Sequence, residues 1–458
     1  MKKRIIAAVA VLILMTGTLF PVFASPTRIE LGVELTATAA IIVNEDTGRV
    51  IYEKNADKRI APASTTKIMS AALAMTMCDD LENTMVTAPY DLWVEFDGID
   101  ISSAGIHGGE TMSMNDLIHC MLLCSANEAA SIVADYFGRE QFIEAMNRKA
   151  KELGCTGTHF VNPHGLDESE HYTTARDLYL ITDWAMSVPG FSDIVSLSSY
   201  TLHETNIHSE RDIYTTIQLQ SEYSGYYTRY IKGIKTGTTD DGGRCLVTRG
   251  ESGGMTFTSI IMGCPMEIDT RIWEEGQSAF TNTRLALDWC FDHTAVTEIV
   301  KRGTPVSETT LKYAKHKDYL MLYASESVST ILQTNTGEDP VIIYETEIPE
   351  SVDAPVASGQ VIGTAKVFSD GMYIGDIDLV ALEDIEKSYF IYYMDVINRI
   401  LTSRTAIVVY GVFLVLASVY CYYMLVVVKR KENEMRKRAE ERRQRESQEQ
   451  RGRNRPRM

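Results

Sequence analysis

A serine and a lysine three residues apart open an apolar stretch of the chain and could perform acyl transfer. Ser64 and Lys67 form an S-x-x-K sequence, and almost every residue from there to Met77 is apolar. Residues i and i+3 share one face of a helix, so the Lys67 amine can reach the Ser64 hydroxyl. The helix N-terminus adds N–H groups beside the nucleophile. The pair alone is weak evidence, because an N-cap serine followed by a surface lysine has the same spacing.

Two further short sequences strengthen this interpretation. Ser125-Ala126-Asn127 lies in a turn between predicted helices at 114–124 and 128–137, and Lys235-Thr236-Gly237 directly follows a predicted strand at 230–234. Each alone could be a helix cap or a hairpin turn. In this order, S-x-x-K, an S-x-N-like element and K-T-G form the pattern of the penicillin-recognising serine acyl transferases.

The chemistry explains why these residue types are needed. A lysine can act as a base only when it is neutral, and deprotonating an unperturbed lysine at pH 7 costs ~4.6 kcal/mol. Burial and a second cation lower the pKa of a lysine, and Lys235 is the candidate cation for Lys67. Ser125 can relay a proton toward the leaving amine, and Asn127 can hold Lys67 or a substrate amide.

The remaining residues of the pattern fit substrate binding. Lys235 and Thr236 can bind a free carboxylate of the substrate. Gly237 leaves space where the substrate approaches a strand edge. The backbone N–H groups of Ser64 and Thr238 can form an oxyanion hole, worth ~3–4 kcal/mol per donor.

Other segments carry a family resemblance. The segments Phe160–Leu166, His171–Leu178 and Gly233–Thr239 resemble D-alanyl-D-alanine carboxypeptidases, the low-molecular-mass penicillin-binding proteins. The resemblance spans roughly residues 38–291, and the stretch 354–375 is more loosely similar to the C-terminal β domain of that family.

The resemblance implies an activity and assigns roles. It implies removal of the terminal D-alanine from peptidoglycan stem pentapeptides through an acyl-serine, with β-lactam antibiotics such as penicillins as acylating agents. Ser64 would be the nucleophile and Lys67 the base, with Ser125 and Asn127 as the relay pair and Lys235 as the cation that binds the carboxylate. The sequence departs from the family in two places. Thr238 stands where some members have histidine, and a full membrane span replaces the usual amphipathic C-terminal helix.

Two other functions remain open on the sequence. A class A β-lactamase shares the ordered triple, but it needs a deacylating glutamate in an E-x-x-L-N-like segment, and we find none between the second and third elements. A non-catalytic wall-binding or signalling protein of the same fold is the third interpretation. The intact residues Ser64, Lys67, Ser125 and Lys235 speak against it.

The predicted elements indicate an α+β fold. A strand–turn–strand pattern at 38–61 and strands at 230–234, 244–248 and 257–262 flank helical segments, which predicts a β-lactamase/transpeptidase-like catalytic domain with one antiparallel sheet. Short β-rich runs separated by turns follow, which predicts a small all-β domain before a C-terminal transmembrane helix. The expected division is a signal peptide at 1–24, the catalytic domain at 25–296, the β domain at 297–385, a stalk at 386–404, the transmembrane helix at 405–428 and a basic cytoplasmic tail at 429–458.

The two ends of the chain predict its location. Lys2, Lys3 and Arg4 before an apolar run predict a secretory signal peptide, with an uncleaved anchor as the alternative. The segment 405–428 has no charged residue and is long enough to cross a bilayer. Because basic residues follow it at once, we expect a single-pass protein of the cell membrane, with an external catalytic body and a tail near anionic lipid.

Charge, cysteine and histidine patterns limit the partners. The net charge is −18, although both ends are basic, so the main body is strongly acidic and nucleic-acid binding is not expected. Seven cysteines lie outside the predicted span, an odd number without any C-x-x-C, which favours buried free thiols over a disulfide framework. The nine histidines form no H-E-x-x-H or similar cluster, so we predict no metal and no other cofactor.

Overall fold

The computed structural model describes residues 29, 31–266, 278–334 and 339–453. The predicted signal peptide at 1–24 lies outside these residues. The chain divides into two compact units. The first contains the described residues up to Arg302 together with Glu326–Glu345 and Lys366–Asp376, and the second contains the rest.

The first unit is built on a five-stranded antiparallel sheet with the strand order β2-β1-β9-β8-β7. Its first two strands come from the start of the described chain and the other three from beyond residue 230, which confirms the predicted α+β arrangement. The strands are β1 (Ala39–Asn44), β2 (Arg49–Lys54), β7 (Ile231–Thr239), β8 (Gly243–Ser252) and β9 (Met255–Cys264).

Helices cover both faces of this sheet, so its central strands are apolar on both sides. All six residues of β1 are buried. Ile41 packs into the cluster formed with most of the helices, whereas Ile42 packs on the opposite face with Leu287 and Trp289 of α8 (Ala279–His293).

The helices on the first face position the site. The helix α2 (Thr66–Met77) is buried from Thr66 to Met75, which explains why its sequence is apolar on every side. Helix α2 contacts the 3-10 turn η1 (Ala63–Thr65) and the helices α3 (Met114–Leu122), α4 (Asn127–Tyr136), α5 (Arg139–Glu152) and α6 (Ala175–Ser187). The other elements of this unit are α7 (Phe191–Val195), the pair β3 (Met85–Thr87) and β4 (Thr111–Ser113), the pair β5 (Ser199–Leu202) and β6 (Arg211–Tyr214), and the 3-10 turns η2 (Leu92–Phe96) and η3 (Gln218–Gln220).

The chain after α8 is β-rich, as predicted. One two-stranded sheet pairs β10 (Thr294–Val300) with β13 (Val328–Gln333). A six-stranded sheet has the order β14-β16-β17-β12-β11-β15. Its strands are β11 (Pro305–Lys312), β12 (Tyr319–Ala324), β14 (Ile342–Glu347), β15 (Ser351–Asp353), β16 (Val361–Ser369) and β17 (Met372–Val380).

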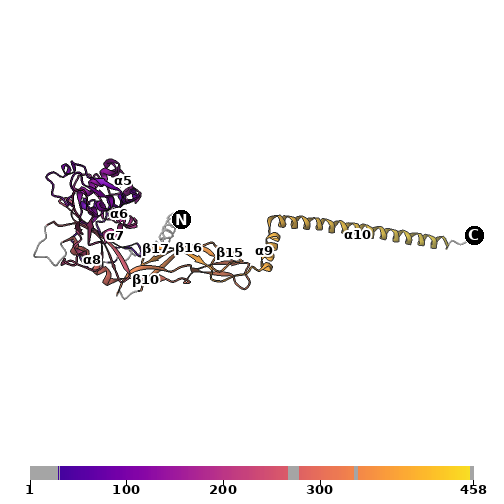
Figure 1. Cartoon of the computed structure of the whole chain (residues 1–458). Helices are drawn as coiled ribbons and strands as arrows, with labels where there is room; N and C mark the ends of the chain where they lie inside the picture. Colours follow the sequence, from indigo (N-terminus) through magenta and orange to yellow (C-terminus); the bar gives the residue numbers. More distant parts are fainter. Residues whose placement is uncertain (1–28, 30, 267–277, 335–338, 454–458) are drawn as a thin grey trace, which may run out of the picture. The chain divides into compact units, whose positions relative to one another are not determined.

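Two helices end the described chain (Figure 1). The predicted stalk contains α9 (Tyr389–Leu401), on which Tyr313 binds Asp395 at 2.8 Å while Phe390 and Ile397 are exposed. An apolar face of α9 thus precedes the candidate span, and the expectation that a full span replaces the amphipathic helix stays a prediction.

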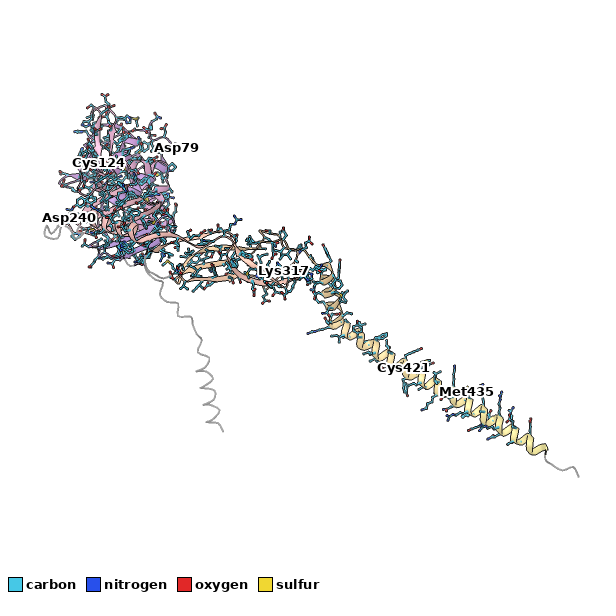
Figure 2. The ribbon with its side chains drawn as sticks, turned by 90° about the horizontal axis from the view of Figure 1, so that it is seen from below. Asp79, Cys124, Asp240, Lys317, Cys421 and Met435 are labelled. Carbon is cyan, nitrogen blue, oxygen red and sulfur yellow. The ribbon has the colours of Figure 1, made fainter. Side chains whose placement is uncertain are left out.

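The last helix, α10 (Arg404–Arg453), is long and apolar enough to cross a membrane, and the residues of its most apolar segment are not buried against the rest of the protein. The side chains of Cys421 and Met435 project freely from this helix (Figure 2). All eight cysteines of the chain are free thiols.

Candidate active site

Ser64 lies in a tight turn at the entrance of the buried helix α2. The turn η1 (Ala63–Thr65) precedes the helix, so the predicted helix begins with one 3-10 turn. The side chains of Thr65 and Thr66 close this turn by donating to the carbonyl oxygens of Pro62 and Ala63. Ser64 itself is half-buried, which leaves its hydroxyl accessible at the surface of a fixed backbone.

Lys67 is completely buried and its amine has three oxygen neighbours. Its Nζ atom lies 2.9 Å from Oγ of Ser64, 2.6 Å from Oδ1 of Asn127 and 2.7 Å from the carbonyl oxygen of His164. Burial, and next the positive charge of Lys235, hold the pKa of Lys67 well below its usual value. The amine therefore lies within hydrogen-bond distance of the Ser64 hydroxyl and holds its own proton less tightly than a lysine in water, which is the arrangement that a base for this hydroxyl needs.

The Ser125-Ala126-Asn127 sequence forms the turn between α3 and α4, where the sequence predicts it. Ser125 is buried and has a φ of +64°, a conformation that costs energy for a residue with a side chain. The backbone N–H of Asn127 donates to the carbonyl oxygen of Ser102 at 2.9 Å. The turn is thus held from the side of the loop that precedes β4, and it presents Asn127 to Lys67.

The Lys235-Thr236-Gly237 sequence lies inside β7, not after a strand as predicted. Successive side chains of a strand point to opposite faces, so Lys235 and Gly237 lie on the buried face of β7 while Thr238 is exposed. Burial lowers the pKa of Lys235 to about 7, and its Nζ atom donates to the carbonyl oxygen of Thr236 at 3.0 Å.

Strand β7 is an edge of the sheet and passes directly beside Ser64. A Cβ atom added at Gly237 would lie 3.2 Å from the backbone nitrogen of Ser64 and 3.1 Å from Cβ of Ala63. The hydroxyl of Thr236 is hydrogen-bonded to Thr216, which precedes η3. The backbone of residues 236–238 and the N–H of Ser64 therefore border the same space.

A charged network supports the carbonyl group of His164 that contacts Lys67. Nε2 of His164 lies 3.1 Å from Oε1 of Glu95, which also binds Arg139 at 2.7 Å and has Ser131 on its other oxygen. Burial raises the pKa of Glu95, but the hydrogen bonds from His164, Arg139 and Ser131 outweigh this effect and lower the pKa of Glu95 to about 2. The sequence predicted no role for Glu95, because nothing in the spacing indicates that it meets His164.

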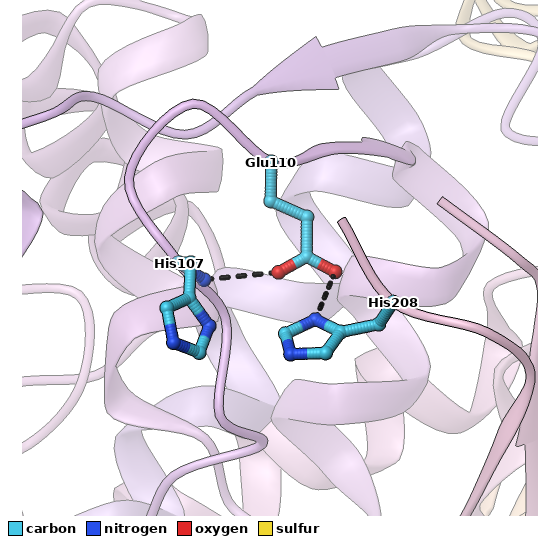
Figure 3. A group of neighbouring side chains, drawn as sticks. All are labelled: His107, Glu110 and His208. Atoms are coloured by element: carbon cyan, nitrogen blue, oxygen red, sulfur yellow. Dashed lines mark hydrogen bonds and ion pairs between the residues drawn. The ribbon is translucent and has the colours of Figure 1, made fainter. Parts of the chain in front are cut away.

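One group in the described part of the chain has the composition of a metal site. It consists of His107, Glu110 and His208 (Figure 3). The buried carboxylate of Glu110 already accepts hydrogen bonds from His208, Thr205 and the backbone N–H of His107, and Arg211 lies 3.4 Å away. These donors, which include the cationic Arg211, hold the Glu110 carboxylate and so link the loop before β4 to the loop between β5 and β6. The expected absence of a metal stays a prediction.

Comparisons with known proteins point to one enzyme family. The model of the D-alanyl-D-alanine carboxypeptidase family matches residues 25–266, and that of the C-terminal domain of penicillin-binding protein 5 matches 296–387. The predicted domain boundaries lie near these limits and stay predictions.

Individual relatives cover most of the chain. It is 28% identical over 367 residues to the D-alanyl-D-alanine carboxypeptidase DacF of Bacillus subtilis, which covers 78% of this chain and 88% of the relative. It is also 28% identical over 363 residues to DacC of Escherichia coli, covering 77% and 85% of the two chains. The crystal structure of penicillin-binding protein 5 from Haemophilus influenzae has a TM-score of 0.58 at 24% identity, covers 77% of this chain and 98% of its own, and shows the shared fold.

Proposed function

Because the chain belongs to the D-alanyl-D-alanine carboxypeptidase family, we propose that Ser64 is the nucleophile with which this serine hydrolase removes the terminal D-alanine of peptidoglycan stem pentapeptides. The observation that carries the assignment is the buried Lys67 amine, 2.9 Å from the Ser64 hydroxyl and held by two further oxygens. A buried amine so close to a serine hydroxyl is the arrangement that activates a serine for acyl transfer.

In the acylation step, Lys67 in its neutral form takes the proton of Ser64 as Oγ attacks the carbonyl carbon of the penultimate residue. The amide bond to the terminal D-alanine breaks, and Lys67 returns the proton to the leaving amine through Ser125. Water then attacks the acyl-serine with Lys67 again as the base, which releases the shortened peptide and restores the enzyme. Penicillins acylate the same serine.

Substrate positioning falls to the strand β7. Protonated Lys235 and the hydroxyl of Thr236 bind the terminal carboxylate, which distinguishes a carboxypeptidase substrate from an internal peptide bond. The substrate backbone lies along this edge strand, where Gly237 leaves space for it. The N–H groups of Ser64 and Thr238 stabilise the oxyanion, a contribution of ~3–4 kcal/mol per donor.

The location follows from the same reasoning. The C-terminal helix α10 is long and apolar enough to span a membrane. The basic residues after position 428 support a cytoplasmic tail near anionic lipid, and with a single span residues 25–404 would lie on the external face, where peptidoglycan is found. Protease treatment of intact cells tests this topology: it should digest the catalytic body and spare an epitope fused after Met458. Digestion of the epitope in intact cells contradicts it.

The activity test compares D-alanine release from a stem pentapeptide by the full-length protein in detergent with that by two variants. Ser64→Ala and Lys67→Met should each reduce release by at least about 100-fold, since each removes a group that takes part in the chemical step. Lys232→Met is the control, because Lys232 is exposed on the same strand as Lys235. Unchanged release by Ser64→Ala contradicts the proposal.

A further inference from the structure

Glu128 is a fully buried carboxylate at the edge of the site, and the reaction described above gives it no role. It follows Asn127 in the first turn of α4 and has no exposed surface. Its Oε1 atom accepts hydrogen bonds from the hydroxyl of Ser103 and from the backbone N–H of Ala104, both at 2.7 Å. The carboxylate is thus fixed by the loop that also holds the N–H of Asn127.

The second oxygen of Glu128 is not neutralised in this way. Among the described residues, Oε2 of Glu128 is buried without a hydrogen-bond partner. Burying an ionised carboxylate is costly unless an opposite charge lies nearby. Asn127, the residue before Glu128 in α4, has its Oδ1 atom 2.6 Å from Nζ of Lys67, so this helix turn brings the carboxylate to the side of the site that holds the buried Lys67 amine.

The electrostatic effect of Glu128 falls on Lys67. Burial and Lys235 lower the pKa of Lys67, and Glu128 is the strongest influence that raises it, followed by Cys124. Glu128 is the one carboxylate among the described groups that act on either amine in this way.

Among the other titratable groups around Lys67, Cys124 also raises the pKa of the amine, but its effect is smaller than that of Glu128. His164 and His171 lie in the loop after α5, and burial lowers the pKa of both, to about 3 for His171, so they are uncharged at neutral pH. Glu95 is engaged with His164 and Arg139. Among the described residues, the carboxylate beside these buried amines that keeps an oxygen without a hydrogen-bond partner is therefore Glu128.

We propose that Glu128 is a positioning residue that acts through Lys67: its buried negative charge stabilises the ammonium that Lys67 becomes when it takes the proton of Ser64. This inference rests on the proposed role of Lys67 as the base. No bond is made or broken at Glu128. The proton moves from Oγ of Ser64 to Nζ of Lys67 and then to the leaving amine.

The proposal has a consequence for the dependence of the rate on pH. Removing the negative charge makes the ammonium form of Lys67 less stable, so its pKa falls further. The acidic limb of kcat/KM, which reports the loss of neutral Lys67, then moves to lower pH. The rate on the plateau also falls severalfold, because a base with a lower pKa accepts the serine proton less readily.

The test measures kcat/KM for D-alanine release against pH with the full-length protein in detergent. Glu128→Gln keeps the size and the acceptor for Ser103 and Ala104 but removes the charge. We expect its acidic limb to lie about one pH unit below that of the wild type. Glu128→Asp keeps the charge and should restore the limb toward the wild-type position. Where Glu128→Gln does not fold, Glu128→Ala carries the same comparison.

Ser103→Ala is the matched control for a purely structural role. It removes one hydrogen bond to the carboxylate and leaves the charge, so the limb should stay in place. An acidic limb of Glu128→Gln at the wild-type position overturns the inference, as does an equal shift in Ser103→Ala. Absence of D-alanine release by the wild-type protein refutes the proposed function instead, which separates the two failures.

Discussion

The Nζ atom of Lys67 and the Oγ atom of Ser64 lie 2.9 Å apart, with the amine completely buried and the serine half-buried. The contact joins a 3-10 turn to the first turn of a buried helix, so the backbone fixes both partners. A lysine in water keeps its proton at neutral pH and cannot act as a base. The burial of α2 lowers the pKa of Lys67, so in the proposed mechanism the apolar sequence after Ser64 contributes to making Lys67 a base.

Replacing Lys235 by methionine should stabilise the protein and inactivate it. The pKa of Lys235 falls from 10.5 to about 7 on folding, so the unfolded chain binds more protons between these pH values. Stability consequently rises with pH through this window, and below pH 7 the buried ammonium costs the full difference, on the order of a few kcal/mol. Lys235→Met removes this cost, so its denaturation midpoint at pH 6.5 should exceed that of the wild type.

The same variant should lose at least about 100-fold in D-alanine release, because the carboxylate loses its cation and the pKa of Lys67 rises without its positive neighbour. Urea denaturation and a D-alanine assay check the two halves. Lys232→Met, on the exposed side of the strand, should change neither quantity. A Lys235→Met protein that is less stable at pH 6.5 contradicts the assignment of Lys235 as a costly buried amine.

Glu95→Gln tests the network behind His164. The pKa of Glu95 is lowered from 4.5 to about 2 in the folded protein, so its contribution to stability is present above pH 4.5 and is lost as the pH falls toward 2. The variant should therefore be less stable than the wild type by about 1–3 kcal/mol at pH 6, and this difference should shrink at pH 3. Urea denaturation at the two pH values measures it, and an equal difference at both contradicts the prediction.

Two glycines beside Ser64 should respond differently to alanine. A Cβ atom at Gly165, where φ is +92°, would lie 1.9 Å from the carbonyl oxygen of Ala63, so Gly165→Ala must displace the turn that presents Ser64. Gly237→Ala meets its neighbours at 3.1–3.2 Å and needs only a small shift. We expect Gly165→Ala to lose penicillin acylation and to unfold at a lower temperature, and Gly237→Ala to fold but acylate more slowly.

Thermal denaturation and the rate of labelling by fluorescent penicillin measure these effects. Gly225→Ala is the control, because no atom lies within 4 Å of the added Cβ. A Gly165→Ala protein with the melting temperature and labelling rate of the wild type would show that the turn at Ala63 tolerates movement.

The adduct with penicillin should be long-lived. The sequence has no E-x-x-L-N-like segment between its second and third elements to supply the deacylating glutamate of class A β-lactamases. The label from fluorescent penicillin should therefore persist on the full-length protein for many minutes after the free antibiotic is removed. Rapid turnover of nitrocefin would instead indicate a β-lactamase.

The sequence predicted most of the fold near the site because its signals are local. The hairpin of β1 and β2 follows from turn residues between apolar runs, and α2 follows from its continuous apolar character. The position of Lys235 was less well predicted: Lys235–Gly237 could be a hairpin turn by sequence, but pairing with β8, with Gly237 opposite Cys245, keeps the strand extended through it.

The contacts that complete the site could not be predicted from spacing. The carbonyl oxygen of His164 accepts a hydrogen bond from Lys67, and Ser103 donates one to Glu128. Each bond joins segments that are far apart in the chain, and neither a backbone carbonyl group nor a loop serine has a sequence pattern that predicts its partner. Glu128 left one signal, an acidic residue in the first turn of a helix, which is common at any helix N-terminus and so was not informative.

Mass spectrometry of the penicillin-treated, full-length protein tests the central assignment most directly. We expect the wild-type protein to gain the mass of one antibiotic molecule, on the peptide that contains Ser64, and the Ser64→Ala protein to gain none. An adduct that persists in Ser64→Ala, or that maps to a peptide without Ser64, would contradict the assignment of this serine as the nucleophile.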